Sequence, residues 1–216
     1  MSNIWFTSDT HFGHLNTQGT GIIDYCKRPF SSIKEMDEAL INNWNQVVQP
    51  GDLVYHLGDL AFVNSIKDLK KYVNKLNGQI IWVAGNHDYL LFDNNGNLSQ
   101  SKIAKVISEV PKIAKVCDRL LLKINDEEIS QQHKQKIVLS HYPMFRWDSM
   151  GYGSWHLFGH VHGTLGYGHF PQALDVGVDI NNFTPVSYNQ IKTRITQRVM
   201  GIIEEVGPKP STNRNH

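Results

Sequence analysis

The chain has little cysteine, little net charge and no long apolar run. Its 216 residues include only two cysteines, Cys26 and Cys117, too few for a disulfide framework in a domain this large, so we expect a reducing, cytoplasmic setting. Lys and Arg number 21 against 20 Asp and Glu, a formal net charge of +1, which excludes the long-range attraction that a strongly basic protein exerts on nucleic acid or anionic membranes. No segment resembles a membrane span or a signal peptide, so neither membrane insertion nor secretion is expected.

Histidine, in contrast, is abundant, with eleven residues in the chain. The length suits one compact domain, which we place at residues 1–206. Residues 207–216, rich in Pro, Asn and Ser, have nothing to bury and are expected to form a loose tail.

Short apolar runs alternate with helical patterns in the first half of the chain. Runs at 4–8, 53–57 and 80–84 predict buried strands, and the apolar spacing over 32–48 predicts a helix that Ser32 and Glu35 open as a capping box. The second half is richer in strands, and the segments concerned are 116–124, 137–140, 155–161 and 174–178. A final helix is expected within 187–203.

Polar residues that bind metals follow several of these runs. The carboxyl ends of parallel strands meet at one edge of an open α/β sheet, where ligands commonly bind. Oxygen and imidazole donors without thiolates suit Mn, Fe, Zn or Ni and argue against a structural zinc or an iron–sulfur cluster. Seven ligands exceed what one ion needs, so a pair of ions sharing a carboxylate is the better hypothesis. The seven are Asp9, His11, Asp59, Asn86, His141, His160 and His162.

Five motifs carry a resemblance to a known family. They are D-x-H at 9–11, G-D at 58–59, G-N-H-D at 85–88, the histidine at 141 and G-H-x-H at 159–162. Each is weak alone, but all five in this order make the chain similar to the calcineurin-like metallophosphoesterases, with an opening like that of small bacterial and phage-type members. The resemblance implies an α/β fold, a four-layer α/β/β/α sandwich of two mixed sheets.

The resemblance also implies a role for each matching residue. Asp9, His11 and His162 would hold one ion, Asn86, His141 and His160 a second, and Asp59 would bridge both. His87 would face the scissile phosphate and stabilise its charge or protonate the leaving oxygen. Its neighbour Asp88 is expected to orient a ring nitrogen of His87. The nucleophile would be a metal-bridging hydroxide attacking in line.

Other residues leave alternatives open. His14 and Arg28, in the insert of residues 12–50, contact phosphate oxygens if that insert folds over the metals; otherwise they are a loop histidine and a solvated arginine. Tyr142, Tyr152 and Trp155 either stack on a nucleobase or pack in the core.

These expectations combine into a functional hypothesis. The chain is expected to be a cytoplasmic phosphodiesterase with two divalent ions, Mn preferred, acting on a nucleotide or cyclic nucleotide. A phosphomonoesterase and a non-catalytic interaction scaffold are the alternatives. The balanced charge disfavours a nonspecific nuclease, which relies on neutralising several phosphates. The oligomeric state is left open.

Overall fold

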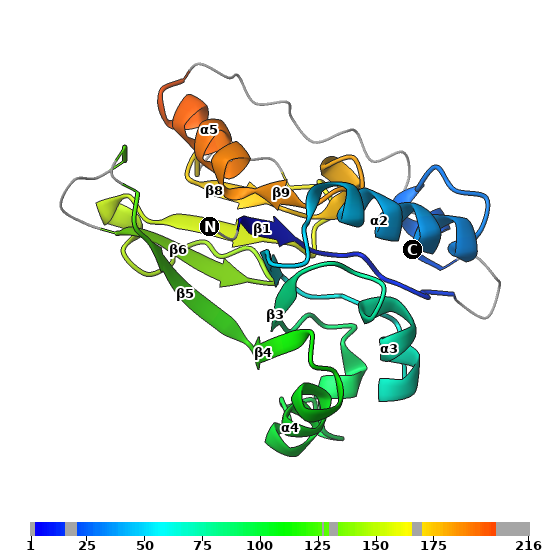
Figure 1. The fold of residues 1–216 in the computed structure, drawn as a ribbon. Helices are drawn as coiled ribbons and strands as arrows, with labels where there is room; N and C mark the ends of the chain where they lie inside the picture. Colours follow the sequence, from blue (N-terminus) through cyan, green and yellow to red (C-terminus); the bar gives the residue numbers. More distant parts are fainter. Residues whose placement is uncertain (1–2, 16–20, 127, 130–133, 166–169, 202–216) are drawn as a thin grey trace.

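The computed structural model describes residues 3–15, 21–126, 128–129, 134–165 and 170–201, and Figure 1 shows their arrangement. The first sheet contains five strands in the order β4-β3-β2-β1-β9. Strands β1 to β4 are parallel, and β9 pairs antiparallel with β1 at the edge. The strands are β1 (Ile4–Thr7), β2 (Leu53–His56), β3 (Gln79–Val83), β4 (Ile113–Cys117) and β9 (Val186–Ser187).

The second sheet contains four strands in the order β5-β6-β7-β8. Strands β6, β7 and β8 are parallel, whereas β5 pairs antiparallel with β6. Two mixed sheets with helices confirm the predicted fold class. The strands are β5 (Arg119–Ile124), β6 (Gln135–Ser140), β7 (Trp155–Phe158) and β8 (Ala173–Asp175).

Helices α2, α3 and α4 pack on the outer face of the first sheet. Ser32 caps α2 by accepting a hydrogen bond from the Glu35 main chain, but the Glu35 side chain accepts from Ser31 and not from Ser32, so only half of the predicted capping box forms. Met36, Leu40 and Trp44 of this helix are buried in one cluster with residues of β2 and β3. The α-helices are α1 (Ile22–Cys26), α2 (Ile33–Val47), α3 (Ile66–Val73), α4 (Gln100–Glu109) and α5 (Tyr188–Val199), and the 3-10 helices are η1 (Tyr89–Leu91), η2 (Met150–Tyr152) and η3 (Val178–Ile180).

A second apolar cluster joins the facing sides of the two sheets. Phe6 and Tyr55 from the first sheet share it with Leu139 and Trp155 from the second, since alternate residues of a strand point to opposite faces. Helix α5 adds Ile191 and Ile195 to this cluster. A smaller cluster with Val138, Trp147 and Phe158 covers the outer face of the second sheet.

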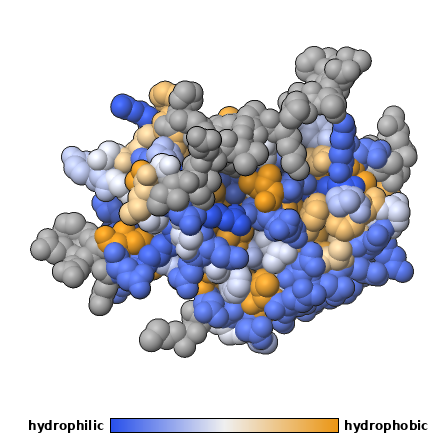
Figure 2. Space-filling model, turned by 90° about the horizontal axis from the view of Figure 1, so that it is seen from above, coloured by the Kyte–Doolittle hydropathy of each residue, from blue (hydrophilic) through white to orange (hydrophobic). Residues whose placement is uncertain are grey.

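The alternation of apolar residues does not reveal where the chain changes sheets. The run predicted as one strand, 116–124, is divided at Asp118 into β4 of the first sheet and β5 of the second. The tail expected at 207–216 lies outside the described residues. Figure 2 shows a largely hydrophilic face with small separate apolar patches. Within the described ranges, every helix is too short or too polar to cross a bilayer.

Candidate metal centre

The motif residues meet at the edge where the parallel strands of both sheets end. Main-chain hydrogen bonds join neighbouring strand ends within each sheet, from Asp9 N to the Gly58 carbonyl (3.0 Å) and from Gly159 N to the His141 carbonyl (3.0 Å). The two sheets are joined there as well, because His160 N donates to Asp9 Oδ2 over 3.0 Å. Residues far apart in sequence therefore form one cluster.

Two groups of donor atoms built from the motif residues stand out within this cluster, beside a third group of Cys26, His162 and Asp179 that shares His162 with one of them. The ligand atoms within each group lie within 4.8 Å of one another. The first group is Asp9, His11 and His162, and the second is Asp59, His141 and His160. Asn86 adjoins the second group, since its Oδ1 lies 2.9 Å from His141 Nε2.

Asp59, a member of the second group, also faces the first group. Its Oδ2 is 3.5 Å from His11 Nε2 and also 3.5 Å from His141 Nε2. Its other oxygen, Oδ1, accepts a hydrogen bond from the His87 main chain over 2.8 Å. One carboxylate oxygen thus faces a histidine of each group while the second oxygen is held by the main chain.

The donor atoms of the cluster fit divalent cations. His141 Nδ1 lies 2.8 Å from the Leu57 carbonyl, which can only accept, so Nδ1 is the donor and Nε2, 2.9 Å from Asn86 Oδ1, is left to bind a cation. His11 Nε2 is buried and has no hydrogen-bond partner among the described residues. Buried polar atoms in proteins normally have partners. A cation would satisfy each of these atoms.

The main chain is unusual at the same positions. Asp9, His11, Asp59, His160 and His162 all have left-handed backbone conformations, with φ between 47° and 70°. Such φ values are uncommon outside glycine and concentrate at functional sites, where surrounding structure holds them. The fold thus fixes these side chains through their backbone as well as through packing.

Glycines let the strand ends approach closely. A Cβ atom on Gly85 would lie 2.5 Å from the Asp59 main-chain nitrogen, and one on Gly159 would lie 2.5 Å from Asp9 Oδ2. Gly58 combines a φ of +96° with close contact to the His141 ring. The glycines of the G-D, G-N-H-D and G-H-x-H motifs are thus required by space.

Burial and crowding shift the titration of these groups. Burial, together with the charge of Asp9, raises the pKa of Asp59 to about 7. Burial and then the neighbouring His162 lower the pKa of His11 well below its ordinary value. Burial opposes protonation of His162, but its hydrogen bond to Asp179 raises the pKa of His162 to about 11. A bound cation would stabilise buried carboxylates that lie close together, as those of Asp9 and Asp59 do.

His87 lies beside the first group, with its ring centroid 5.4 Å from that of His11. Its Nδ1 is 3.0 Å from the Tyr89 hydroxyl, which leaves Nε2 available. His14 also reaches the site, because its Nδ1 lies 3.0 Å from His11 Nδ1. The His14 ring stacks on Phe62 with centroids 4.1 Å apart.

Asp88 does not orient His87, contrary to the sequence-based expectation. The carboxylate is buried and accepts hydrogen bonds from the main chain of Asp59, Leu60 and Gly85 and from Trp82 Nε1, at 2.7–3.0 Å. The neighbouring side chains diverge because Asp88 turns inward to satisfy these donors. Asp88 therefore holds the loop that carries Asp59, and Tyr89 is the partner of the His87 ring.

Arg28 is likewise placed differently from the expectation that it contacts phosphate. Its side chain is 0% exposed and forms an ion pair with Asp179, Nε to Oδ1, at 2.8 Å. The guanidinium also donates to the main-chain carbonyls of Asp9 (2.6 Å) and Thr10 (3.1 Å). The insert folds against the strand end and buries Arg28 between Asp179 and the main chain of Asp9 and Thr10, so its guanidinium is already occupied.

Asp179 is the main residue that the sequence reasoning missed. Its Oδ2 lies 2.7 Å from His162 Nδ1. Asp179 follows the strand-like run 174–178, so the rule that singled out Asp9 and Asp59 as carboxylates after strands applies to it as well. Tyr89 had no comparable sequence pattern.

The aromatic residues have different environments. Tyr142 is 49% exposed and its ring centroid lies 4.6 Å from that of His160, whereas Trp155 is buried in the core. Tyr152 is exposed and, with Phe145, Trp147 and Phe170, lines a cavity of about 550 Å³. None of the expected metal ligands lines this cavity, so of the three residues considered for stacking on a nucleobase only Tyr142 adjoins the cluster.

Comparison with known proteins gives the family to which this two-sheet fold and its cluster of metal-binding residues belong. The profile described as calcineurin-like phosphoesterase matches residues 2–164. The chain belongs to this family. Members act on phosphate esters and typically depend on divalent metals, for which this chain has candidate ligand groups.

Similar proteins provide little further detail. An uncharacterized protein of Methanocaldococcus jannaschii is 48% identical over 89 residues, which are 41% of this chain and 48% of that protein. The Gene 66 protein of Mycobacterium phage L5 is 30% identical over 90 residues, 41% of each chain. The matched region thus spans less than half of either relative. A solved structure of a protein of unknown function from Aquifex aeolicus shares the fold, with a TM-score of 0.58, 22% identity and coverage of 89% of this chain and 99% of that one.

Proposed function

We propose that the chain is a binuclear metal-dependent phosphodiesterase acting on a nucleotide or cyclic nucleotide. The observation that carries the proposal is the position of Asp59, whose Oδ2 lies 3.5 Å from a histidine of each donor group. A shared carboxylate is the arrangement by which proteins hold two ions as a pair. Asp9, His11 and His162 would hold one ion, and Asn86, His141 and His160 the other, with Mn preferred over Fe, Zn or Ni.

The ions, when bound, supply the activation of water and the neutralisation of phosphate charge. The chain's own residues position the substrate. His87 uses Nε2, the ring nitrogen that Tyr89 does not contact, to stabilise the phosphate or to give a proton to the leaving oxygen. The Tyr89 hydroxyl fixes the ring through Nδ1, and His14, stacked on Phe62, offers a polar contact at the same side.

Charge favours a diester over a monoester. A phosphomonoester carries a second negative charge, which enzymes commonly meet with an arginine fork. Arg28, the arginine that the sequence suggested, is buried and paired with Asp179, so it is not available for phosphate. Tyr142, half exposed beside His160, provides a flat surface for a nucleobase or nucleoside.

Two free cysteines agree with the proposed cytoplasmic setting.

The proposal is tested with metal-stripped protein. We expect no turnover of bis-p-nitrophenyl phosphate until Mn²⁺ is added, and a slower reaction with p-nitrophenyl phosphate. Asp59→Asn keeps the shape but removes the shared charge, so this variant should stay folded and lose turnover. A faster reaction with the monoester would favour a phosphomonoesterase.

Absence of turnover with Mn²⁺, Fe²⁺, Zn²⁺ and Ni²⁺ would contradict the enzyme proposal and favour an interaction scaffold. Comparison of cyclic nucleotides, mononucleotides and single-stranded DNA under the same conditions then identifies the substrate class. We expect the nucleotides to react faster than the DNA, because the balanced charge offers few phosphate contacts along a strand.

A further inference from the structure

We propose that the buried Arg28–Asp179 pair is a positioning device for the first metal site. The inference rests on the metal centre of the proposed function. It concerns two residues that do not contact the ion themselves but determine where His162 and Asp9 lie.

Asp179 fixes the ring of His162. Its Oδ2 lies 2.7 Å from Nδ1, so Nδ1 donates to Asp179 and Nε2 is the nitrogen that would bind the ion. Carboxylates that bond a ligating histidine in this way set the orientation of its ring and increase its basicity. Asp179 comes from η3, seventeen residues after His162, so it does not follow from the local motif.

Arg28 in turn fixes Asp179. Its guanidinium forms two parallel hydrogen bonds with the carboxylate, each 2.8 Å long, from Nε to Oδ1 and from a terminal nitrogen to Oδ2. A two-point contact of this kind prevents rotation of the carboxylate. The Arg28 side chain is 0% exposed and that of Asp179 is 9% exposed, so water competes little with the pair.

The same guanidinium reaches the other ligand segment. It donates to the carbonyl oxygens of Asp9 (2.6 Å) and Thr10 (3.1 Å), where the chain adopts the left-handed conformation between β1 and His11. One arginine from the insert therefore holds the main chain of Asp9 and, through Asp179, the side chain of His162.

The pair links a residue inside the region that the family profile matches, residues 2–164, to a residue beyond that region. Arg28 lies in the insert of residues 12–50, and Asp179 lies beyond residue 164, where the family match ends. We infer that the insert contributes to metal binding by holding the ligands in place and not by contacting phosphate.

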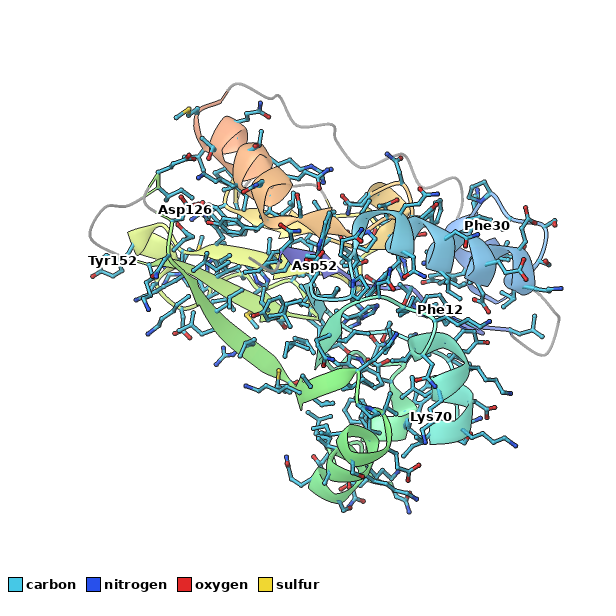
Figure 3. All side chains as sticks on the ribbon, viewed as in Figure 1. Phe12, Phe30, Asp52, Lys70, Asp126 and Tyr152 are labelled. Atoms are coloured by element: carbon cyan, nitrogen blue, oxygen red, sulfur yellow. The ribbon has the colours of Figure 1, made fainter. Side chains whose placement is uncertain are left out.

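Cobalt titration of the metal-stripped full chain tests the inference. Asp179→Asn is compared with Asp126→Asn, a matched control because Asp126 also pairs with a cation, Lys192 Nζ at 2.8 Å, and its side chain is 8% exposed. Figure 3 shows Asp126 at the opposite end of the molecule from Phe30, which follows Arg28 by two residues. Calorimetry gives the affinity of each site, and the visible spectrum of bound Co²⁺ reports its coordination.

We expect Asp179→Asn to weaken one site by about 10- to 100-fold, as is typical for partners of ligating histidines, and to leave the other site unchanged. Asp126→Asn should bind both ions as the wild type does. Equal affinities and spectra in the two variants would overturn the inference.

A second variant provides a test if Asp179→Asn does not fold. Arg28→Lys keeps the buried charge but loses the fork and the bonds to Asp9 and Thr10, so the same site should weaken to a smaller extent. A folded Arg28→Lys variant with wild-type affinity at both sites overturns the inference. Wild-type protein that binds two Co²⁺ but hydrolyses no ester contradicts the proposed function alone, and wild-type protein that binds no ion contradicts both.

Discussion

The main-chain nitrogen of His87 donates a 2.8 Å hydrogen bond to Oδ1 of Asp59. The loop that presents the proposed catalytic histidine is thereby tied to the carboxylate shared by the two donor groups. Any shift of Asp59 on metal binding is passed to His87 through one bond, so the metal centre and the histidine are positioned together.

Replacement of His87 should separate catalysis from metal binding. The His87 ring belongs to neither donor group, so His87→Ala should retain its metals while kcat falls by about 10²- to 10⁴-fold, the range for loss of a general acid. Tyr89→Phe removes only the partner of Nδ1 and should cause a smaller fall. Metal content and steady-state rates measured together check this, and an unchanged rate in His87→Ala would refute the catalytic role.

Gly85→Ala should disrupt the metal centre by displacing the main chain of Asp59. The new Cβ would lie 2.5 Å from the Asp59 main-chain nitrogen, and two rigid segments cannot both yield, so we expect a loss of about 3 kcal/mol in the free energy of unfolding. Gly51→Ala is the control, because a Cβ there meets nothing within 4 Å. Urea unfolding monitored by circular dichroism compares them, and similar midpoints would contradict the prediction.

Asp88→Asn should destabilise the fold without replacing any of the proposed metal ligands. Asp88 accepts four N–H groups, and the amide nitrogen of Asn would face donors and leave at least one of them unpaired, at a cost of about 3 kcal/mol. Asp93 accepts two main-chain N–H groups at the surface, so Asp93→Asn should cost less than about 1 kcal/mol. Thermal unfolding of both variants provides the measurement. Equal losses would mean that the buried network contributes little.

Asp37 should make stability depend on pH. Burial raises the pKa of Asp37 to about 6, against the hydrogen bonds from Gly13 N and Tyr72, which lower it. The unfolded chain has a pKa of about 3.9 at this group, so between about pH 4 and 6 the folded state binds more protons and its stability falls as pH rises. Asp37→Asn removes this contribution and should gain stability relative to the wild type from pH 4 to 7. Parallel melting-temperature profiles over that range would exclude the effect.

The sequence predicts the composition of the cluster because its pattern is local. Asp9 and Asp59 follow apolar runs, and parallel strands with that pattern must end at one edge. Strand alternation also predicts which residues face the core between the sheets, such as Phe6 and Tyr55.

The partners of the polar side chains could not be predicted in the same way. Arg28 and Asp179 are 151 positions apart, and their pairing depends on how the insert packs against η3. Asp88 and His87 are adjacent, yet one turns inward and the other outward, because buried N–H groups of Asp59 and Leu60 require an acceptor. Tertiary packing determines the direction and partner of each of these side chains, and the local spacing of residues does not reveal them.

The left-handed backbone at five of the seven proposed ligand positions limits how such a site can evolve. Asp, Asn, His and Gly adopt this conformation more readily than other residues, and β-branched side chains adopt it rarely. A descendant that lost its metals would still be restricted to this small set at positions 9, 11, 59, 160 and 162. The backbone conformation would then keep ligand-type residues at these positions after metal binding was lost. A sequence with Asp, Asn or His there would therefore not by itself prove activity.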